Sequence, residues 1–176
     1  MSILKVDTIN EKTTGNGVEI AHALKGSGIA GFSIQTVYNS YATQITVPTG
    51  GSFVDTGLSA TITPKFNTSK ILVLISQQYS LYQATSGSDI GLGWRVFRDT
   101  TAVLNHATAY AAYSYHGSSS GQTADHRGTF SIMCFDSPST TSSITYKTQA
   151  QKYSSGTASL QNAGNHSEMV LMEIAQ

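Results

Sequence analysis

Apolar and polar residues alternate along the chain from about residue 31 onward, while the spacing of an amphipathic helix is nearly absent. Successive side chains of a strand point to opposite faces, so this alternation predicts short strands separated by polar turns. The expected strands are residues 33–38, 44–47, 53–55, 58–63, 70–81, 90–98, 102–106, 108–115, 128–136, 143–151, 158–161 and 168–174. Residues 98–101 are expected to form a hairpin turn, and residues 117–127 a polar loop.

Two of these segments are apolar on both faces. Residues 70–81 have an uninterrupted apolar centre at 71–75, which predicts a position in the middle of a sheet that is covered on both sides. The last strand is similar, because residues 169–174 are almost all apolar. We expect it to lie beside the first strand of the domain or at a subunit interface.

The number of strands and the absence of crossover helices predict an all-β fold, specifically an antiparallel sandwich. A jelly roll is the expected topology, because two packed sheets protect their edges. Residues 31–176 are assigned to this jelly-roll head domain. A domain of this size buries enough apolar surface to form a core without disulfides.

Residues 1–30 have a different pattern, in which two very short extended pieces, 4–9 and 17–20, are joined by a polar turn. An isolated two-stranded unit is marginal in water, so this segment needs another surface to bury its apolar side chains. We predict a short extended N-terminal arm that attaches the head to a partner or intertwines with other copies. The expected anchors are Leu4, Val6, Ile9, Val18 and Ile20.

The composition narrows the classes of partner that the protein is expected to bind. Ten basic and ten acidic residues give a net charge of +0, which argues against binding to nucleic acid. No apolar run approaches the roughly 20 residues that span a bilayer, and no apolar segment of a secretory signal is present, so synthesis in a host cytoplasm without membrane insertion is expected. The single cysteine, Cys134, excludes an intrachain disulfide and is expected to be a buried, inert thiol.

No arrangement of residues predicts catalysis, a cofactor or a metal site. Asp125 and His126 fall in the expected loop 117–127, with His116 just before it. They fit either a metal or pH-sensitive cluster or, as we favour, a solvated polar loop, because histidine spacing alone is a weak metal signal. No paired carboxylates suit glycoside hydrolysis, and no serine lies in a Gly-x-Ser-x-Gly elbow.

Tyrosines offer a candidate recognition surface. Tyr110, Tyr113 and Tyr115 alternate along one expected strand, near His116 and His126. Tyrosine presents a large amphipathic contact area, so these five residues are candidates for binding a carbohydrate or a protein. The alternative is that the tyrosines line a subunit interface or the sandwich core.

Several segments carry recognisable motifs: KVDTI (5–9), GNGVEI (15–20), FVDTGLSATITPK (53–65), TSKILV (68–73) and MVLMEI (169–174). They resemble the opening and stalk motifs, the first head strands and the closing strand of tailed-phage fibre proteins, especially those of marine and cyanobacterial phages. Heads of this type are similar to trimeric C1q/TNF-like jelly rolls. The resemblance covers most of the chain as a pattern, and residues 4–20 and 53–73 are its specific parts.

The resemblance implies a non-enzymatic, homotrimeric virion protein that binds phage capsid or tail proteins through its arm. The stalk-like part is under about forty residues, which favours a capsid decoration protein or a short head or tail fibre on the virion surface. The alternative is the receptor-binding tip of a tail fibre that recognises a host surface glycan or protein. A ligand-binding jelly roll of the cytosol, unrelated to phage, is a weaker third interpretation.

Overall fold

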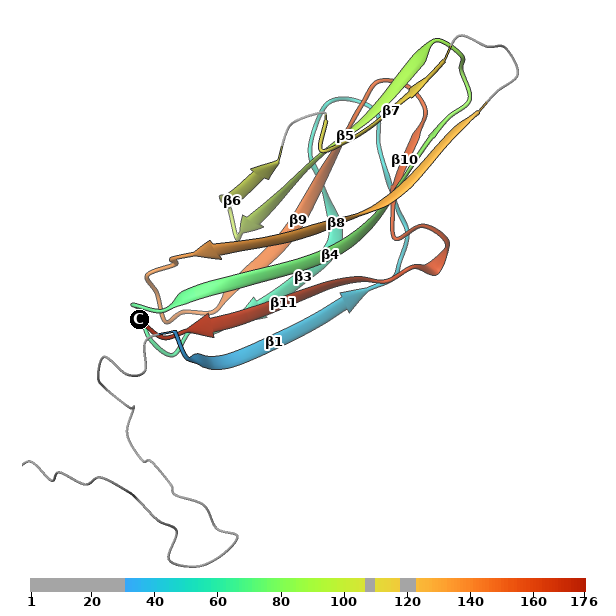
Figure 1. Cartoon of the computed structure of the whole chain (residues 1–176). Coiled ribbons are helices and arrows are strands. Elements are labelled where there is room, and N and C mark those ends of the chain that lie inside the picture. The colour runs from blue at the N-terminus through green and yellow to red at the C-terminus, as the bar shows by residue number, and fades with distance from the viewer. Residues whose placement is uncertain (1–30, 107–109, 118–122) are drawn as a thin grey trace, which may run out of the picture.

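The computed structural model describes residues 31–106, 110–117 and 123–176, and within them eleven strands form two antiparallel sheets (Figure 1). The strands are β1 (Ser33–Tyr41), β2 (Ile45–Val47), β3 (Val54–Ile62), β4 (Lys70–Gln83), β5 (Ser88–Arg98), β6 (Thr101–His106), β7 (Ala112–His116), β8 (Ala124–Asp136), β9 (Ile144–Tyr153), β10 (Thr157–Leu160) and β11 (Ser167–Ile174). A short 3-10 turn, η1 (Asn162–Gly164), joins β10 to β11. No described helix has the length and apolar character to cross a membrane.

The strand order is that of a jelly roll. Sheet A runs β1-β11-β4-β10-β2, with β8 on the other side of β4, and sheet B runs β3-β9-β5-β6, with β7 also paired to β5. The chain crosses between the layers repeatedly, because β3, β5 and β9 belong to sheet B while β4, β8 and β11 belong to sheet A. The predicted all-β antiparallel sandwich is therefore confirmed. The last strand, β11, pairs with the first strand, β1, as expected.

The core lies between the two sheets and is built by alternate residues of their strands. Trp94 of β5 is fully buried and stacks on Phe130 of β8, with ring centroids 5.2 Å apart. Its indole Nε1 donates to Oε1 of buried Gln77 at 2.7 Å, and Gln77 Nε2 donates to Oγ1 of Thr56 at 2.9 Å. Buried polar groups are costly unless they are paired, so these bonds let a polar chain cross the core.

The long strand β4 lies in the middle of sheet A, as its sequence predicts. It pairs with β8 along one side and with β11 and then β10 along the other. Its two faces differ, because Ile71, Val73 and Ile75 are buried against sheet B while Leu72 and Leu74 on the outer face are half-buried. The expectation of cover on both sides is therefore wrong for the described residues of one chain.

Several strand boundaries differ from the sequence-based prediction, such as β7 at Ala112–His116 where residues 108–115 were expected, and two differences change how segments are assigned. Residues 53–55 and 58–63 belong to one strand, β3, which contains a register irregularity around Gly57, where the φ angle is +83°. Strand β8 begins at Ala124, so Asp125 and His126 lie on a strand and the polar loop ends earlier than predicted. The sequence pattern did not indicate the start of β8, because residues at the exposed end of a strand need no alternation of apolar side chains.

The first described residues meet the end of the last strand. The amide of Gly31 donates to the carbonyl of Ala175 at 2.8 Å, and the amide of Ala175 donates to the carbonyl of Phe32 at 2.9 Å. The predicted arm, including Leu4, Val6, Ile9, Val18 and Ile20, lies outside the described residues. Whatever precedes residue 31 therefore joins the head beside the C-terminal end of β11 (Figure 1).

Candidate interaction surfaces

The outer side of sheet A carries two cross-strand rows of apolar side chains. Register places Phe135, Leu72 and Met172 in one row. Met133, Leu74 and Val170 form the second row next to it. Paired residues of an antiparallel sheet point to the same face, so the rows form one continuous surface, which we call the apolar face. Its members are Leu72, Leu74, Met133, Phe135, Val170 and Met172.

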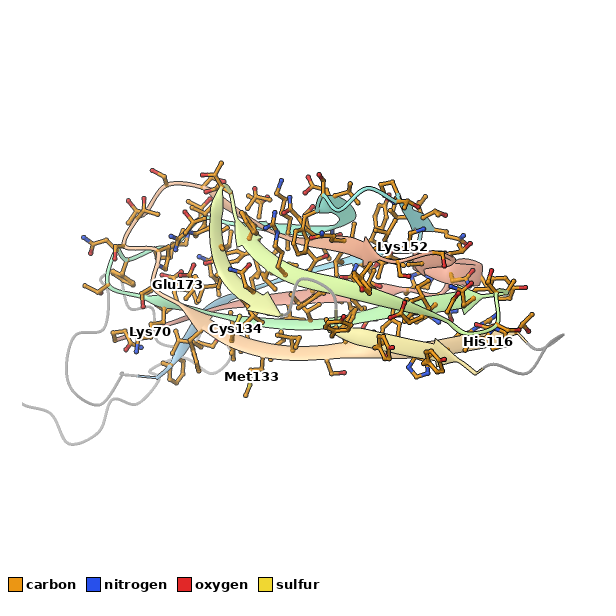
Figure 2. All side chains as sticks on the ribbon, turned by 90° about the horizontal axis from the view of Figure 1, so that it is seen from above. Lys70, His116, Met133, Cys134, Lys152 and Glu173 are labelled. Atoms are coloured by element: carbon orange, nitrogen blue, oxygen red, sulfur yellow. The ribbon has the colours of Figure 1, made fainter. Side chains whose placement is uncertain are left out.

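The apolar face lacks a cover in the described part of the chain. Met133 is 69% exposed and Phe135 59% exposed, and Figure 2 shows Met133 on the outer side of sheet A. A shallow groove of about 380 Å³ runs beside Met133, Leu74 and Val170. Tyr38, 59% exposed, pairs with Val170 and extends the surface onto β1. Contiguous exposed apolar patches of this kind mark interaction sites in soluble proteins.

Charged groups lie at the margins of the apolar face. Lys70 pairs with Ile174 at one end, and Glu168 pairs with Ser76 at the other. Glu168 also accepts a hydrogen bond from the Tyr38 hydroxyl at 3.3 Å. An apolar centre with a polar rim is the usual anatomy of a protein–protein interface.

A second aromatic surface lies on the outer side of sheet B. The ring of Tyr110 is 5.4 Å from that of Tyr113 and 5.5 Å from that of Tyr153, and the Tyr113 hydroxyl donates to Asp89 at 3.3 Å. Tyr110 and Tyr115 are each 59% exposed. We call Tyr110, Tyr113, Tyr115 and Tyr153 the tyrosine patch. Of the predicted tyrosines, all three belong to it, and Tyr153 is an addition that sequence proximity did not indicate.

The two predicted histidines are not part of the tyrosine patch. His116 is only 5% exposed, and neither ring nitrogen has a hydrogen-bond partner among the described residues, so its assignment to a recognition surface is wrong. His126 is exposed and lies on β8 of sheet A, where Nε2 is 3.1 Å from the Tyr79 hydroxyl. Strand alternation explains the first difference, because His116 faces inward while Tyr115 faces outward.

Several titratable groups form structural contacts inside the sandwich. Asp136 binds Arg98 Nη1 at 2.6 Å and accepts the Tyr146 hydroxyl at 2.8 Å, and burial, with Asp136 close by, raises the pKa of Tyr146. Burial also raises the pKa of the half-buried Cys134 thiol, which therefore stays protonated and unreactive. No group of three or more histidine, cysteine, aspartate or glutamate side chains among the described residues is placed to hold a metal ion.

The sequence indicates the part of the apolar face that lies on β8, but not the residues of β4 beside it. Residues 130–135 are apolar except for Ser131, with Met133 and Phe135 on the side opposite Phe130 and Cys134. A strand with apolar side chains on both faces needs cover on both. Only the pairing of β8 with β4 shows that its second face adjoins Leu72 and Leu74.

No protein-family model and no curated protein matches the chain. Similar solved structures include the infectious bursal disease virus Gx strain, at 18% identity over 80% of this chain and 38% of that chain, with a TM-score of 0.38. The VP2 subviral particle of infectious bursal disease virus is 17% identical over 82% and 39%, with a TM-score of 0.37. The T13 IBDV viral particle is 16% identical over 81% and 36%, with a TM-score of 0.41.

The chain thus spans less than two fifths of the length of these virus proteins. At this identity and TM-score, the similarity carries no argument about function.

Proposed function

We propose that this chain is a non-enzymatic structural protein of a phage particle, a homotrimeric capsid decoration protein or short head or tail fibre. The observation that carries the proposal is the apolar face, which a single chain leaves exposed on the outer side of sheet A. Self-association is the simplest way to cover it. The resemblance of the sequence to trimeric phage heads favours three copies.

The energetics favour cover by other copies. Met133 is 69% and Phe135 59% exposed, so burial of the remaining surface would contribute about 1–2 kcal/mol for each side chain in each copy. The half-buried Leu72, Leu74 and Val170 would add to this gain. Most soluble oligomers close by rotational symmetry, and an apolar face turned toward a threefold axis would be covered by the two other copies around that axis.

The position of residue 31 supports a role for the arm. Gly31 lies at the end of β11, and β11 contributes Val170 and Met172 to the apolar face. In a trimer built on this face, three arms would leave the heads close together. Three weakly bound arms then act as one strongly bound group, through the high effective concentration of the second and third arm. Leu4, Val6, Ile9, Val18 and Ile20 are the proposed anchors into capsid or tail proteins.

Light scattering coupled to size-exclusion chromatography tests the self-association. We expect the full chain to be a trimer and the double variant Met133→Glu, Phe135→Glu to be a monomer, because each carboxylate would have to be buried without a partner. Both positions are exposed in the single chain, so circular dichroism should show an unchanged fold. The control Tyr115→Glu, on the opposite side of the sandwich, should remain trimeric.

A monomeric full chain would contradict the proposal. A double variant that is still trimeric would show that another surface holds the copies together.

The tyrosine patch favours a second candidate function, the receptor-binding tip of a tail fibre. Its clustered rings and the carboxylate of Asp89 are groups that commonly bind glycans and proteins. Binding of the labelled, isolated protein to host cells, with Tyr113→Ala and Tyr115→Ala as variants, tests it. Labelling across the capsid would favour decoration, whereas labelling of the tail alone would favour a fibre.

A further inference from the structure

The outer face of β4 changes character halfway along the strand. In the first half of β4 the outward side chains of Leu72 and Leu74 belong to the apolar face. The last two outward side chains of the strand are those of Ser80 and Tyr82. This polar half is hollowed into a groove of about 240 Å³, which we call the polar groove. The side chains that line it are Gln44, Ser80, Tyr82, Asp125, Arg127, Thr157, Ser159 and Asn162.

Three neighbouring strands build the polar groove. Tyr82 pairs with Asp125 of β8 on one side and with Thr157 of β10 on the other. Two residues earlier in β4, Ser80 pairs with Arg127 of β8 and with Ser159 of β10. Strands lie about 4.8 Å apart, so these two rows span about 10 Å of rigid, hydrogen-bonded backbone. Side chains held on such a frame are better fixed for recognition than side chains on a loop.

The charges of the polar groove compensate each other. Arg127 Nη2 donates to Asp125 Oδ2 at 2.9 Å, and Arg127 Nε donates to Asp125 Oδ1 at 3.2 Å. The bonds from Arg127, helped by one from Ser80, hold the pKa of Asp125 below its usual value, so the carboxylate is charged at neutral pH. A paired groove of zero net charge gives no advantage to a phosphate or to a cationic peptide.

The remaining hydrogen-bonding capacity suits hydroxyl groups. The guanidinium has five N–H donors, of which Asp125 uses two, and the carboxylate, bonded by Arg127 twice and by Ser80, keeps capacity to accept one more hydrogen bond. Thr157 and Ser159 add hydroxyls that donate and accept, and Gln44 and Asn162 add amides. Tyr82, 41% exposed, supplies an apolar ring surface among these polar groups. Sugars combine the same two features, an apolar ring face and closely spaced hydroxyls.

We propose that the polar groove binds a neutral saccharide, with a sugar ring packed on Tyr82 and its hydroxyls hydrogen-bonded to Asp125 and Arg127. This site goes beyond the structural role and does not depend on it, because the apolar face and the polar groove occupy different halves of β4. It is also separate from the tyrosine patch, which lies on the other sheet.

Saturation-transfer NMR and titration calorimetry on the full chain test the proposal, with D-glucose, D-galactose, D-mannose and N-acetyl-D-glucosamine as probes. At least one of these sugars should bind saturably, with a dissociation constant in the millimolar range, as expected for a few hydrogen bonds and one ring contact. Inorganic phosphate, as the charged probe, should not compete. The absence of saturable binding for all four sugars would overturn the proposal.

Variants locate the bound sugar. Tyr82→Ala and Asp125→Asn should each weaken binding about tenfold or more, since each removes a direct contact. Asp125→Asn is nearly isosteric at an exposed site, so it keeps the test valid if Tyr82→Ala fails to fold. The matched control Phe66→Ala removes an aromatic ring of similar exposure, 40% against 41% for Tyr82, from the connection between β3 and β4, and should bind as the wild type does. Loss of binding in Phe66→Ala or in the tyrosine-patch variant Tyr115→Ala, with binding unchanged in Tyr82→Ala and Asp125→Asn, would place the sugar elsewhere and overturn the assignment.

Discussion

Glu173 shows how single residues determine stability in this fold. Its side chain is fully buried on the inner face of β11. Oε1 accepts the backbone amides of Lys65 at 2.8 Å and Phe66 at 3.1 Å, and Oε2 accepts Gln35 Nε2 at 2.6 Å. Burial alone would raise the pKa of Glu173, but these bonds to the charged form outweigh it and leave the pKa below its usual value.

The lowered pKa predicts a pH dependence of stability. A carboxyl group with a lower pKa in the folded state stabilises that state above its unfolded pKa, about 4.3, and the contribution is lost as pH falls through the folded value. Glu173→Gln should therefore lower the melting temperature at pH 7 and flatten its fall between about pH 5 and pH 3. Thermal denaturation followed by circular dichroism measures both effects.

The exposed Glu168 on the same strand gives a control. Glu168→Gln should change the melting temperature little at any of these pH values, because surface substitutions usually cost under about 0.5 kcal/mol. A Glu173→Gln variant as stable as the wild type at pH 7 would show that the buried hydrogen bonds do not favour the charged form.

At the scale of elements, Gly57 allows β3 and β1 to approach each other. Its φ angle of +83° is one that other residues rarely adopt, and a Cβ atom at this position would collide with the ring of Tyr41. Gly87 has a similar φ angle of +70°, but, its chain neighbours aside, no atom of the described residues lies within 4 Å of its Cβ position. Substitutions at these two glycines can therefore separate the free-energy cost of backbone strain from the cost of a steric clash with a neighbour.

Alanine at the two positions should differ in cost. Gly87→Ala should destabilise the protein by about 1 kcal/mol, the cost of a left-handed alanine. Gly57→Ala should cost at least about 1 kcal/mol more, because the Tyr41 ring must also move. Urea denaturation gives both values, and equal losses would mean that the Tyr41 contact contributes nothing to stability.

At the scale of the whole molecule, the described residues form a continuous core of their own. Its buried cluster is drawn from residues between Val47 and Leu171, in both sheets. Deletion of residues 1–20 should therefore leave a folded head, with a melting temperature within a few degrees of the full chain. The same deletion should abolish incorporation into particles, if the arm is the attachment segment.

An incorporation assay with purified particles and labelled protein measures this effect. The quintuple replacement of Leu4, Val6, Ile9, Val18 and Ile20 by serine provides a control of unchanged length, and it should fail in the same way. A truncated protein that still decorates particles fully would contradict the proposed role of the arm.

Much of the fold was predictable because strand alternation is local. Segments such as 70–81 and 169–174 carry their periodicity in a few consecutive residues, and a two-sheet sandwich is the standard way to bury such strands. The predictions were wrong where the local pattern is silent, at the polar start of β8 and at the bulge of β3. Among the residues proposed for recognition, Tyr115 faces outward whereas His116 turns inward, because neighbouring residues of a strand point to opposite faces.

Apolar alternation at a period of two already specifies an antiparallel β-sandwich for this protein, because it leaves few other ways to form a core. The division of the outer face of sheet A, in contrast, depends on how the strands pair in the folded chain. Cross-strand register brings Met133 and Val170 beside Leu74 to form the apolar face, and Asp125 and Thr157 beside Tyr82 to form the polar groove. These partners are far apart in the chain, and only the register of folded strands fixes which of them meet.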